Sequence, residues 1–268
     1  MTKKMADETE KSLINIKQEQ AVAWLVLNRP AQRNALSAAL LADLDAALQN
    51  LLADERVRVV ILVGAGGHFC AGQDLSERDP RQLDKMPDLE AVQKQLYHPL
   101  LSRIAETGKP VIAAVDGIAA GAGAGLALHC DLVLASNQAR FYLAFARLGL
   151  AVDAGLGWHL VRQLGRARTA QLLMSGGSLS AEEAHAAGLV SQICEGSAQE
   201  AAAELAAQLA AGPQQALAEI KQLCRQAGQL DFASYLKAEA AGQGRAGAHP
   251  DYAEGVLAFL EKRPAAFR

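Results

Sequence analysis

A run of glycines in the middle of the chain is the first feature that points to chemistry. Residues 109–131 read KPVIAAVDGIAAGAGAGLALHCD, in which a buried strand-like run precedes several glycines and a helical apolar segment. The first N–H groups of a helix have no partner within it, and the helix dipole adds partial positive charge there. A negatively charged atom can therefore bind at this point. Close packing of helix on strand is the other reason for glycine here, and this stretch alone does not decide between the two.

One acid stands out because of its neighbours. Asp153 lies among apolar residues in the segment LGLAVDAG (148–155), just before a glycine-rich helix start. Burial would raise the pKa of this carboxyl toward that of a useful proton shuttle, whereas the helix dipole would lower it. Its alternative role is that of an N-cap for a helix that begins near Ala154.

The cysteines do not form a metal-binding pattern. They lie far apart, without CxxC spacing or paired histidines, at Cys70, Cys130, Cys194 and Cys224. We interpret them as buried thiols in a reducing compartment and expect neither a disulfide framework nor a metal site.

The elements that must position these residues alternate along the first part of the chain. Strands and helices in alternation predict an α/β layer arrangement with crossover connections. The sequence predicts a hairpin at 13–27, a helix capped by Ser37 that ends near residue 53, a strand at 57–63, a charged surface loop at 76–90, a helix at about 91–106, and strands at 111–115 and 131–135.

Beyond residue 165 strands become rare and alanine-rich amphipathic helices take over. We expect a helix at about 166–174, a capping box at 180–183, a short strand at 189–194, and helices at about 197–211, 213–227, 231–241 and 250–261. The chain is thus divided into a loose polar tail (1–12), a core (13–195) and a helical C-terminal region (196–268). Apolar faces on such helices are typical of packing against a body or a sister subunit.

Composition excludes several classes of protein. A chain of 268 residues can bury a sizeable core, and its net charge of −3 with only 4% aromatic residues offers no surface typical of nucleic-acid binding. The longest apolar stretch, 111–128, contains an aspartate and four glycines, which is too interrupted to cross a bilayer. The polar N-terminus lacks the apolar core of a secretory signal. We therefore expect a cytoplasmic protein that binds neither nucleic acid nor membranes.

Several segments together resemble the crotonase family, also called the enoyl-CoA hydratase/isomerase family. They are FCAGQDL (69–75) and GIAAGAG (117–123), supported by NRPAQRNAL (28–36) and LSAEEAHAAGL (179–189). The resemblance covers nearly the whole chain. It implies a crotonase-like α/β fold, a β-β-α superhelix with a helical C-terminal trimerisation region. It also implies an acyl-CoA thioester as the partner and a homotrimer or a dimer of trimers as the assembly.

Members of that family hold the thioester carbonyl between two backbone N–H groups, which the resemblance assigns to Gln73 and Ala122. Two fixed donors in a dry pocket stabilise the negative oxygen of an enolate as it forms. Arg33 is a candidate contact to the CoA phosphates, or else a solvated surface cation. The full set of substrate-binding candidates is Arg33, Ala71, Gln73, Asp74, Leu75, Gly121, Phe145 and Leu148.

The sequence departs from the hydratase pattern of the family. Hydratases use two glutamates, and the matching positions hold Gly125 and Phe145, neither of which transfers a proton. An acid at position 153 resembles the isomerase branch, including ring-1,2-epoxyphenylacetyl-CoA isomerases. We therefore predict an acyl-CoA isomerase of aromatic or fatty acyl-CoA catabolism. Asp153 would remove a proton while Gln73 and Ala122 hold the enolate oxygen, and would then return it elsewhere. No cofactor is expected, since coenzyme A is part of the substrate.

Three alternatives remain: an enoyl-CoA hydratase, an aryl-CoA dehalogenase-like hydrolase and a non-catalytic acyl-CoA-binding scaffold. In 4-chlorobenzoyl-CoA dehalogenase, another crotonase relative, an aspartate and a histidine at positions that resemble Asp153 and His98 displace the halide and activate water. His98 is therefore a possible accessory residue, although the tryptophan expected near the aspartate has no counterpart here. Loss of both glutamates fits a scaffold, whereas an acid kept at 153 favours an enzyme.

Overall fold

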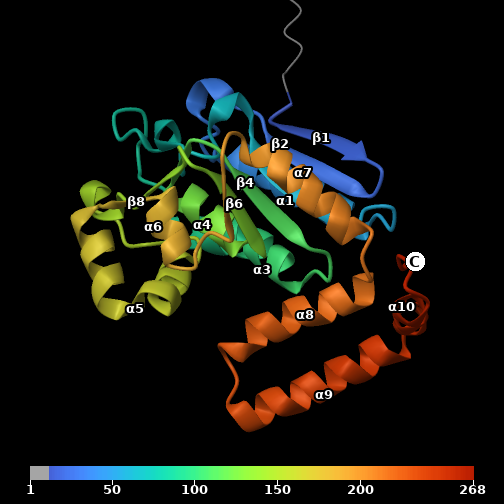
Figure 1. The fold of residues 1–268 in the computed structure, drawn as a ribbon. Coiled ribbons are helices and arrows are strands. Elements are labelled where there is room, and N and C mark those ends of the chain that lie inside the picture. The colour runs from blue at the N-terminus through green and yellow to red at the C-terminus, as the bar shows by residue number, and fades with distance from the viewer. Residues whose placement is uncertain (1–11) are drawn as a thin grey trace, which may run out of the picture.

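A six-stranded sheet forms the centre of the molecule in the computed structural model, which describes residues 12–268 (Figure 1). The predicted tail at 1–12 therefore lies outside the described residues, apart from Ser12. The strand order is β1-β2-β3-β4-β6-β9, with β1 and β2 antiparallel and the other pairs parallel. The strands are β1 (Ile14–Glu19), β2 (Val22–Leu27), β3 (Val59–Gly64), β4 (Val111–Val115), β6 (Leu132–Ser136) and β9 (Gln192–Cys194).

The central strands are apolar on both faces because helices cover both. Along β3, Val60 and Leu62 face a core that contains the leucines of α1 (Ala38–Ala53). Val59, Ile61 and Val63 face the opposite way, onto the buried alanines of α7 (Ala198–Ala210). A parallel sheet covered on both faces requires such continuous apolar strands. Ser37 caps α1 as predicted, its side chain accepting a hydrogen bond from the Leu40 N–H.

A second, three-stranded sheet lies beside the first and was not predicted. It has the order β5-β7-β8 and consists of β5 (Ile118–Ala120), β7 (Arg140–Tyr142) and β8 (Ser178–Ser180). Each strand is three residues long, which is too short to show an alternating pattern. β5 leads directly into the glycine-rich helix α4 (Ala122–His129), so this sheet positions the start of that helix.

The remaining helices differ from the predicted ones mainly in their bounds. The helix expected at 91–106 is made of α2 (Leu89–Val92), the π-helical turn η4 (Gln93–Tyr97) and α3 (His98–Glu106). The helix expected at 166–174 is part of a longer α5 (Leu156–Ser175), which is kinked at Gly165. The other short segments are η1 (Pro30–Gln32), η2 (Ala65–Gly67), η3 (Leu75–Arg78), η5 (Phe145–Leu148) and α6 (Ala181–Ala186).

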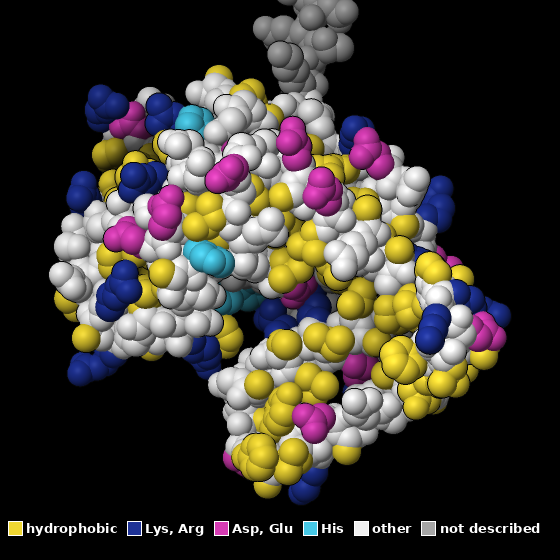
Figure 2. All heavy atoms as spheres, viewed as in Figure 1, with side chains coloured by type: hydrophobic (Ala, Val, Ile, Leu, Met, Phe, Trp, Pro, Cys, Tyr) yellow, Lys and Arg dark blue, Asp and Glu magenta, His cyan; other side chains and the backbone are white. Residues whose placement is uncertain are grey.

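The last three helices extend away from the body and form an arm (Figure 1). The arm consists of α8 (Gln214–Ala227), α9 (Phe232–Ala248) and α10 (Pro250–Glu261). The helical region predicted to begin at 196 thus has two parts, since α7 packs on the sheet and only the later helices leave it. Figure 2 shows apolar side chains gathered on the surface of the arm, where Phe232 is 75% and Phe259 82% exposed. No helix within residues 12–268 is long and apolar enough to span a membrane.

Candidate active site

Two backbone segments far apart in the sequence lie side by side at the glycine-rich centre. The Cys70 N–H donates to the Ile118 carbonyl at 2.9 Å, and the Ala120 N–H donates to the Cys70 carbonyl at 2.8 Å. The chain must come close here, because a Cβ built on Gly72 would lie 2.6 Å from the Ala120 carbonyl oxygen. The pairing brings Gln73 next to Ala122, the two residues predicted to donate to the thioester oxygen.

The backbone N–H of Gln73 is left unpaired by the way this segment is held. On one side, the Leu36 N–H donates to the Gly72 carbonyl and the Asp74 N–H donates to the Leu36 carbonyl. In a parallel bridge of this kind, the N–H of the central residue, Gln73, points the opposite way. Within residues 12–268, no acceptor pairs with it. The Gln73 side chain is fixed separately, because its Oε1 accepts a hydrogen bond of 2.6 Å from the Tyr97 hydroxyl.

The second N–H is free because Ala122 is the first residue of α4. Gly121 turns the chain into this helix with a φ of 48°, a conformation that favours glycine. Its own N–H is bound to the Tyr142 carbonyl of β7, which anchors the turn to the second sheet. The helix dipole adds positive potential at the Ala122 N–H, so both unpaired donors favour a negative oxygen between them.

Asp74 links the segment that contains Gln73 to Arg29 and Ser76. Its carboxylate pairs with Arg29 at 2.7 Å and accepts hydrogen bonds from the N–H and hydroxyl of Ser76. Burial alone would raise the pKa of Asp74, but the bonds from Ser76 and Arg29 outweigh it and lower the pKa. These contacts give Asp74 a structural role, whereas its predicted contact with CoA stays a prediction.

Another predicted CoA contact, Arg33, lies beside the same segment. Arg33 is exposed and adopts a left-handed backbone with a φ of 48°. Its carbonyl accepts a hydrogen bond of 2.9 Å from the Ala71 N–H, so the two residues are neighbours in space as well. Leu75 and Leu148 are both about half exposed, at 47% and 54%. Because Arg33 is exposed, its side chain is accessible to a ligand from solvent. Its binding of the CoA phosphates stays a prediction.

Asp153 has the environment of a proton-transfer group. Its Oδ2 accepts a hydrogen bond of 3.1 Å from the Gln93 side chain, and its Oδ1 is buried with no partner among residues 12–268. Burial raises the pKa of Asp153 to about 6, although the Arg78 charge and the Gln93 bond act in the opposite direction. The alternative role as a helix cap does not hold. The cap of α5 is Gly155, and no side chain bonds to the first turn of that helix.

The absence of a side chain at Gly125 lets the segment that carries Asp153 pack closely against α4. A Cβ built on Gly125 would lie 2.7 Å from the Ala154 carbonyl oxygen and 2.8 Å from the Ala154 Cβ. The segment that carries Asp153 therefore fills the space that a side chain at 125 would need. Ala154 itself has a φ of 49°, a strained conformation of the kind that clusters at functional sites. Phe145, at the other position matched to a hydratase glutamate, is buried.

His98 does not join this group. It is exposed, and its side chain forms no hydrogen bond with any part of the chain that the structure describes. Its neighbour Tyr97 turns inward instead, with 2% of its surface exposed. The structure thus brings together Gln73, Ala122 and Asp153 but leaves His98 outside.

Two residues of the site were missed in the sequence. Gln93 contacts Asp153, and Tyr97 contacts Gln73, both from η4. A π-helical turn leaves no mark in an apolar periodicity, so no local pattern in the sequence indicates these two contacts.

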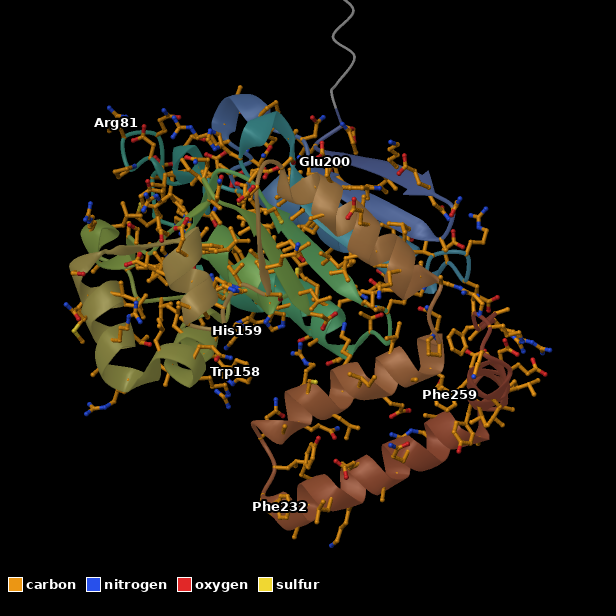
Figure 3. All side chains as sticks on the ribbon, in the orientation of Figure 1. Arg81, Trp158, His159, Glu200, Phe232 and Phe259 are labelled. Atoms are coloured by element: carbon orange, nitrogen blue, oxygen red, sulfur yellow. The ribbon has the colours of Figure 1, made fainter. Side chains whose placement is uncertain are left out.

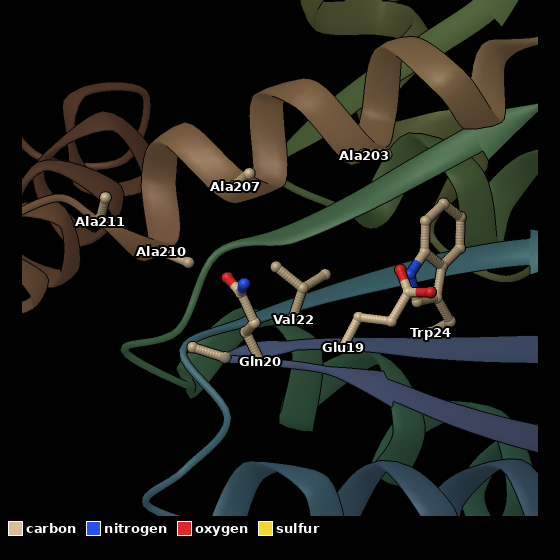
Figure 4. Close-up of a pocket in the computed structure, with 9 residues that line it drawn as sticks. Glu19, Gln20, Val22, Trp24, Ala203, Ala207, Ala210 and Ala211 are labelled. Carbon is tan, nitrogen blue, oxygen red and sulfur yellow. The ribbon is translucent and has the colours of Figure 1, made fainter.

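Besides a cleft of about 630 Å³ among the helices of the arm, two clefts lie away from this group. One of about 700 Å³ separates α5 from α8 and contains Trp158 and His159, which lie on the side of the body facing the arm (Figure 3). In this cleft His129 Nδ1 and His159 Nε2 are 3.1 Å apart. Burial lowers the pKa of both imidazoles to about 4. The other, of about 460 Å³, lies between the β1–β2 turn and the alanines of α7 (Figure 4). No group of three or more metal-binding side chains occurs within residues 12–268.

Comparison with known proteins shows the family of this chain. Residues 17–268 match the family described as enoyl-CoA hydratase/isomerase. The chain belongs to this family. Among its family relatives, the 1,2-epoxyphenylacetyl-CoA isomerase of Escherichia coli (strain K12) is 42% identical over 93% of this chain and 95% of its own. A probable enoyl-CoA hydratase of Rhodobacter capsulatus is 41% identical over 92% and 95% of the two chains.

Solved structures of the family share the fold. The crystal structure of an enoyl-CoA hydratase from Polaromonas sp. JS666 has a TM-score of 0.88 and 36% identity, and the match covers 95% of this chain and 99% of that one. The crotonase-like fold predicted from the sequence is therefore confirmed. The relatives include both isomerases and hydratases by name, so the choice between these reactions depends on the site itself.

Proposed function

We propose that this member of the family is an acyl-CoA isomerase. In the proposed reaction the thioester oxygen lies between the N–H groups of Gln73 and Ala122. Asp153 removes a proton from the acyl chain, and the negative charge moves to that oxygen as the enolate forms. Asp153 then returns the proton at another carbon, or assists expansion of an epoxide-fused ring. The proposed chemistry needs no cofactor besides the CoA of the substrate.

The observation that carries this proposal is a carboxyl with a buried, unpaired oxygen on the segment that packs against α4, the helix whose first residue supplies one of the two unpaired donors. A general base works best when its pKa lies near the operating pH, and burial raises the pKa of Asp153 to about 6. Hydration needs a group to activate water and another to protonate carbon, and neither Gly125 nor Phe145 can do this. One carboxyl that moves one proton between two carbons is sufficient for isomerisation.

For the acyl group we propose 1,2-epoxyphenylacetyl-CoA or a related enoyl-CoA. The support is the likeness to an isomerase of that name and the apolar residues Ala154, next to Asp153, and Phe145, which is buried beside Gly121 at the start of α4. An aromatic or alkenyl group would be compatible with such surroundings.

The experiment is a parallel assay of the purified protein with crotonyl-CoA, a 3-enoyl-CoA and enzymatically generated 1,2-epoxyphenylacetyl-CoA, followed by product chromatography. We expect isomerised products without a 3-hydroxyacyl product. Efficient hydration of crotonyl-CoA would refute the isomerase assignment. Binding of all three thioesters without turnover would favour the scaffold instead.

We further propose that the arm mediates association into a homotrimer or a dimer of trimers. Its surface carries large apolar side chains that are more than 40% exposed, namely Ile220, Phe232, Leu236, Tyr252, Val256, Leu257, Phe259 and Leu260. Apolar surface of this extent on one part of a protein is typical of an interface. Sedimentation should show an oligomer that dissociates on Phe259→Ser. A monodisperse monomer at micromolar concentration would refute association.

A further inference from the structure

The helix that faces the site contains a single π-helical turn, and this turn contacts both parts of the proposed machinery. α2, η4 and α3 follow one another without a break from Leu89 to Glu106. At the end of η4, the His98 N–H donates to the Gln93 carbonyl, five residues back rather than four. Such turns hold an extra residue within a helix and occur frequently at functional sites.

The two ends of the turn point into the site on the same side. Gln93 and Tyr97 are four residues apart, a spacing that places side chains next to each other on a helix. Gln93 Nε2 donates to Asp153 Oδ2 at 3.1 Å, and the Tyr97 hydroxyl donates to Gln73 Oε1 at 2.6 Å. The same turn therefore fixes the carboxyl and the segment that supplies one of the unpaired N–H groups.

We propose that Gln93 is a positioning residue for Asp153, because it donates to Oδ2 and so holds the carboxyl in one orientation. This inference rests on the proposed role of Asp153 as the base. Its geometric support is that the Gln93 amide donates to Oδ2 at 3.1 Å, whereas Oδ1 has no hydrogen-bond partner among residues 12–268. A carboxyl held through one oxygen cannot rotate freely, so the other oxygen keeps a fixed direction.

The charged and titratable groups around Asp153 are few. From η3, the Arg78 charge favours the ionised form of Asp153, and from η4 the phenol of Tyr97 is kept neutral because burial, with a contribution from Asp153, raises its pKa. The Gln93 amide does not titrate but stabilises the carboxylate by donating to it. Removing this donor should therefore raise the pKa of Asp153 further.

The first test does not depend on activity. The pKa of Asp153 is measured by NMR or infrared spectroscopy of protein labelled with ¹³C at the aspartate carboxyl carbon, with Asp153→Asn to assign the signal. Gln93→Met keeps the size of the side chain and removes the donor, and we expect it to raise the pKa of Asp153 by about one unit, the effect of losing a hydrogen bond to a charged group. An unchanged pKa in this variant would overturn the proposal.

The matched control is Gln95→Met in the same turn. Gln95 is exposed and its side chain forms no hydrogen bond with residues 12–268, so the pKa of Asp153 should stay at its wild-type value. A second variant, Gln93→Glu, keeps the shape of the side chain and places a like charge beside Asp153, which should raise the apparent pKa of the pair. If Gln93→Met does not fold, the spectroscopic pKa of Asp153 in Gln93→Glu tests the proposal instead, and an unchanged pKa in that variant would overturn it.

The second test uses turnover and separates this proposal from the proposed function. If the wild-type protein isomerises an acyl-CoA, Gln93→Met should lower kcat about tenfold with little change in KM. The acid limb of its pH profile should move upward by the same interval as the pKa of Asp153. A proportional rise in KM with an unmoved pH profile would overturn the positioning role. If the wild-type protein isomerises none of the substrates, the proposed function fails, and the spectroscopic pKa still decides the role of Gln93.

Discussion

Replacement of Gly125 by alanine tests the contact between α4 and the segment that carries Asp153. In an ordinary helix this change stabilises by about 1 kcal/mol, because alanine has the higher helix propensity. Here the added Cβ would lie 2.7 Å from the Ala154 carbonyl oxygen and 2.8 Å from the Ala154 Cβ, which is too close. Both atoms belong to the backbone or to a side chain of a single carbon, so no flexible group can move aside and the segment itself must shift.

The expected magnitude follows from these two effects. Overpacking of a tight core costs about 1 to 3 kcal/mol, which exceeds the gain in propensity. Gly125→Ala should therefore lower the free energy of unfolding by about 1 kcal/mol, measured by urea titration at fixed protein concentration. A shift of about 1 Å at Asp153 should in addition lower isomerisation on the order of a hundredfold.

A matched control is available in α9. Gly244 is helical and a Cβ there would meet nothing within 4 Å, so Gly244→Ala should stabilise by about 1 kcal/mol and leave activity unchanged. The two substitutions are chemically the same and should act with opposite sign. If Gly125→Ala were as stable and as active as Gly244→Ala, the close contact with Ala154 would be wrong.

Two further predictions concern buried charges. The pKa of Asp153 rises from 3.8 to about 6 on folding, so its ionisation destabilises the folded state as the pH increases through that interval. Asp153→Asn should therefore be more stable than wild type by about 2 kcal/mol above pH 6 and equally stable below about pH 4, as thermal unfolding at several pH values would show. The Lys221 ammonium pairs with Asp131 at 2.7 Å and also donates to the Ile104 and Lys109 carbonyls, which joins α8 to the body. Lys221→Met should lower the free energy of unfolding in urea by about 3 kcal/mol, because it leaves Asp131 without its cation. The control Lys237→Met, at an exposed position of α9, should change this free energy by less than about 0.5 kcal/mol. Equal stabilities of the two lysine variants would contradict this role of Lys221.

Local signals in the sequence predicted the elements that depend on local interactions. Ser37 caps α1, and the capping box of Ser180 and Glu183 opens α6, because each involves residues three positions apart. The partial burial of Asp153 was also predictable, since its immediate neighbours in the sequence are apolar. The free N–H of Ala122 followed from the glycines that begin α4.

Contacts between distant segments could not be predicted in this way. Gln93 and Asp153 are 60 residues apart, and the π-helical turn that aims Gln93 depends on the packing of the whole helix. The three strands of the second sheet are too short to show a period. Likewise, the sequence showed that Gly125 lacks a carboxylate but did not show that Ala154 fills its place.

The most direct test of the account compares wild type with Asp153→Asn in the isomerisation of 1,2-epoxyphenylacetyl-CoA, with calorimetric titration of a non-reactive acyl-CoA alongside. Loss of a general base lowers turnover by about 10² to 10⁴-fold, so we expect at least a hundredfold loss of kcat in the variant with unchanged binding of the thioester. A variant that isomerises within a few-fold of wild type would show that Asp153 is not the base and would contradict the account.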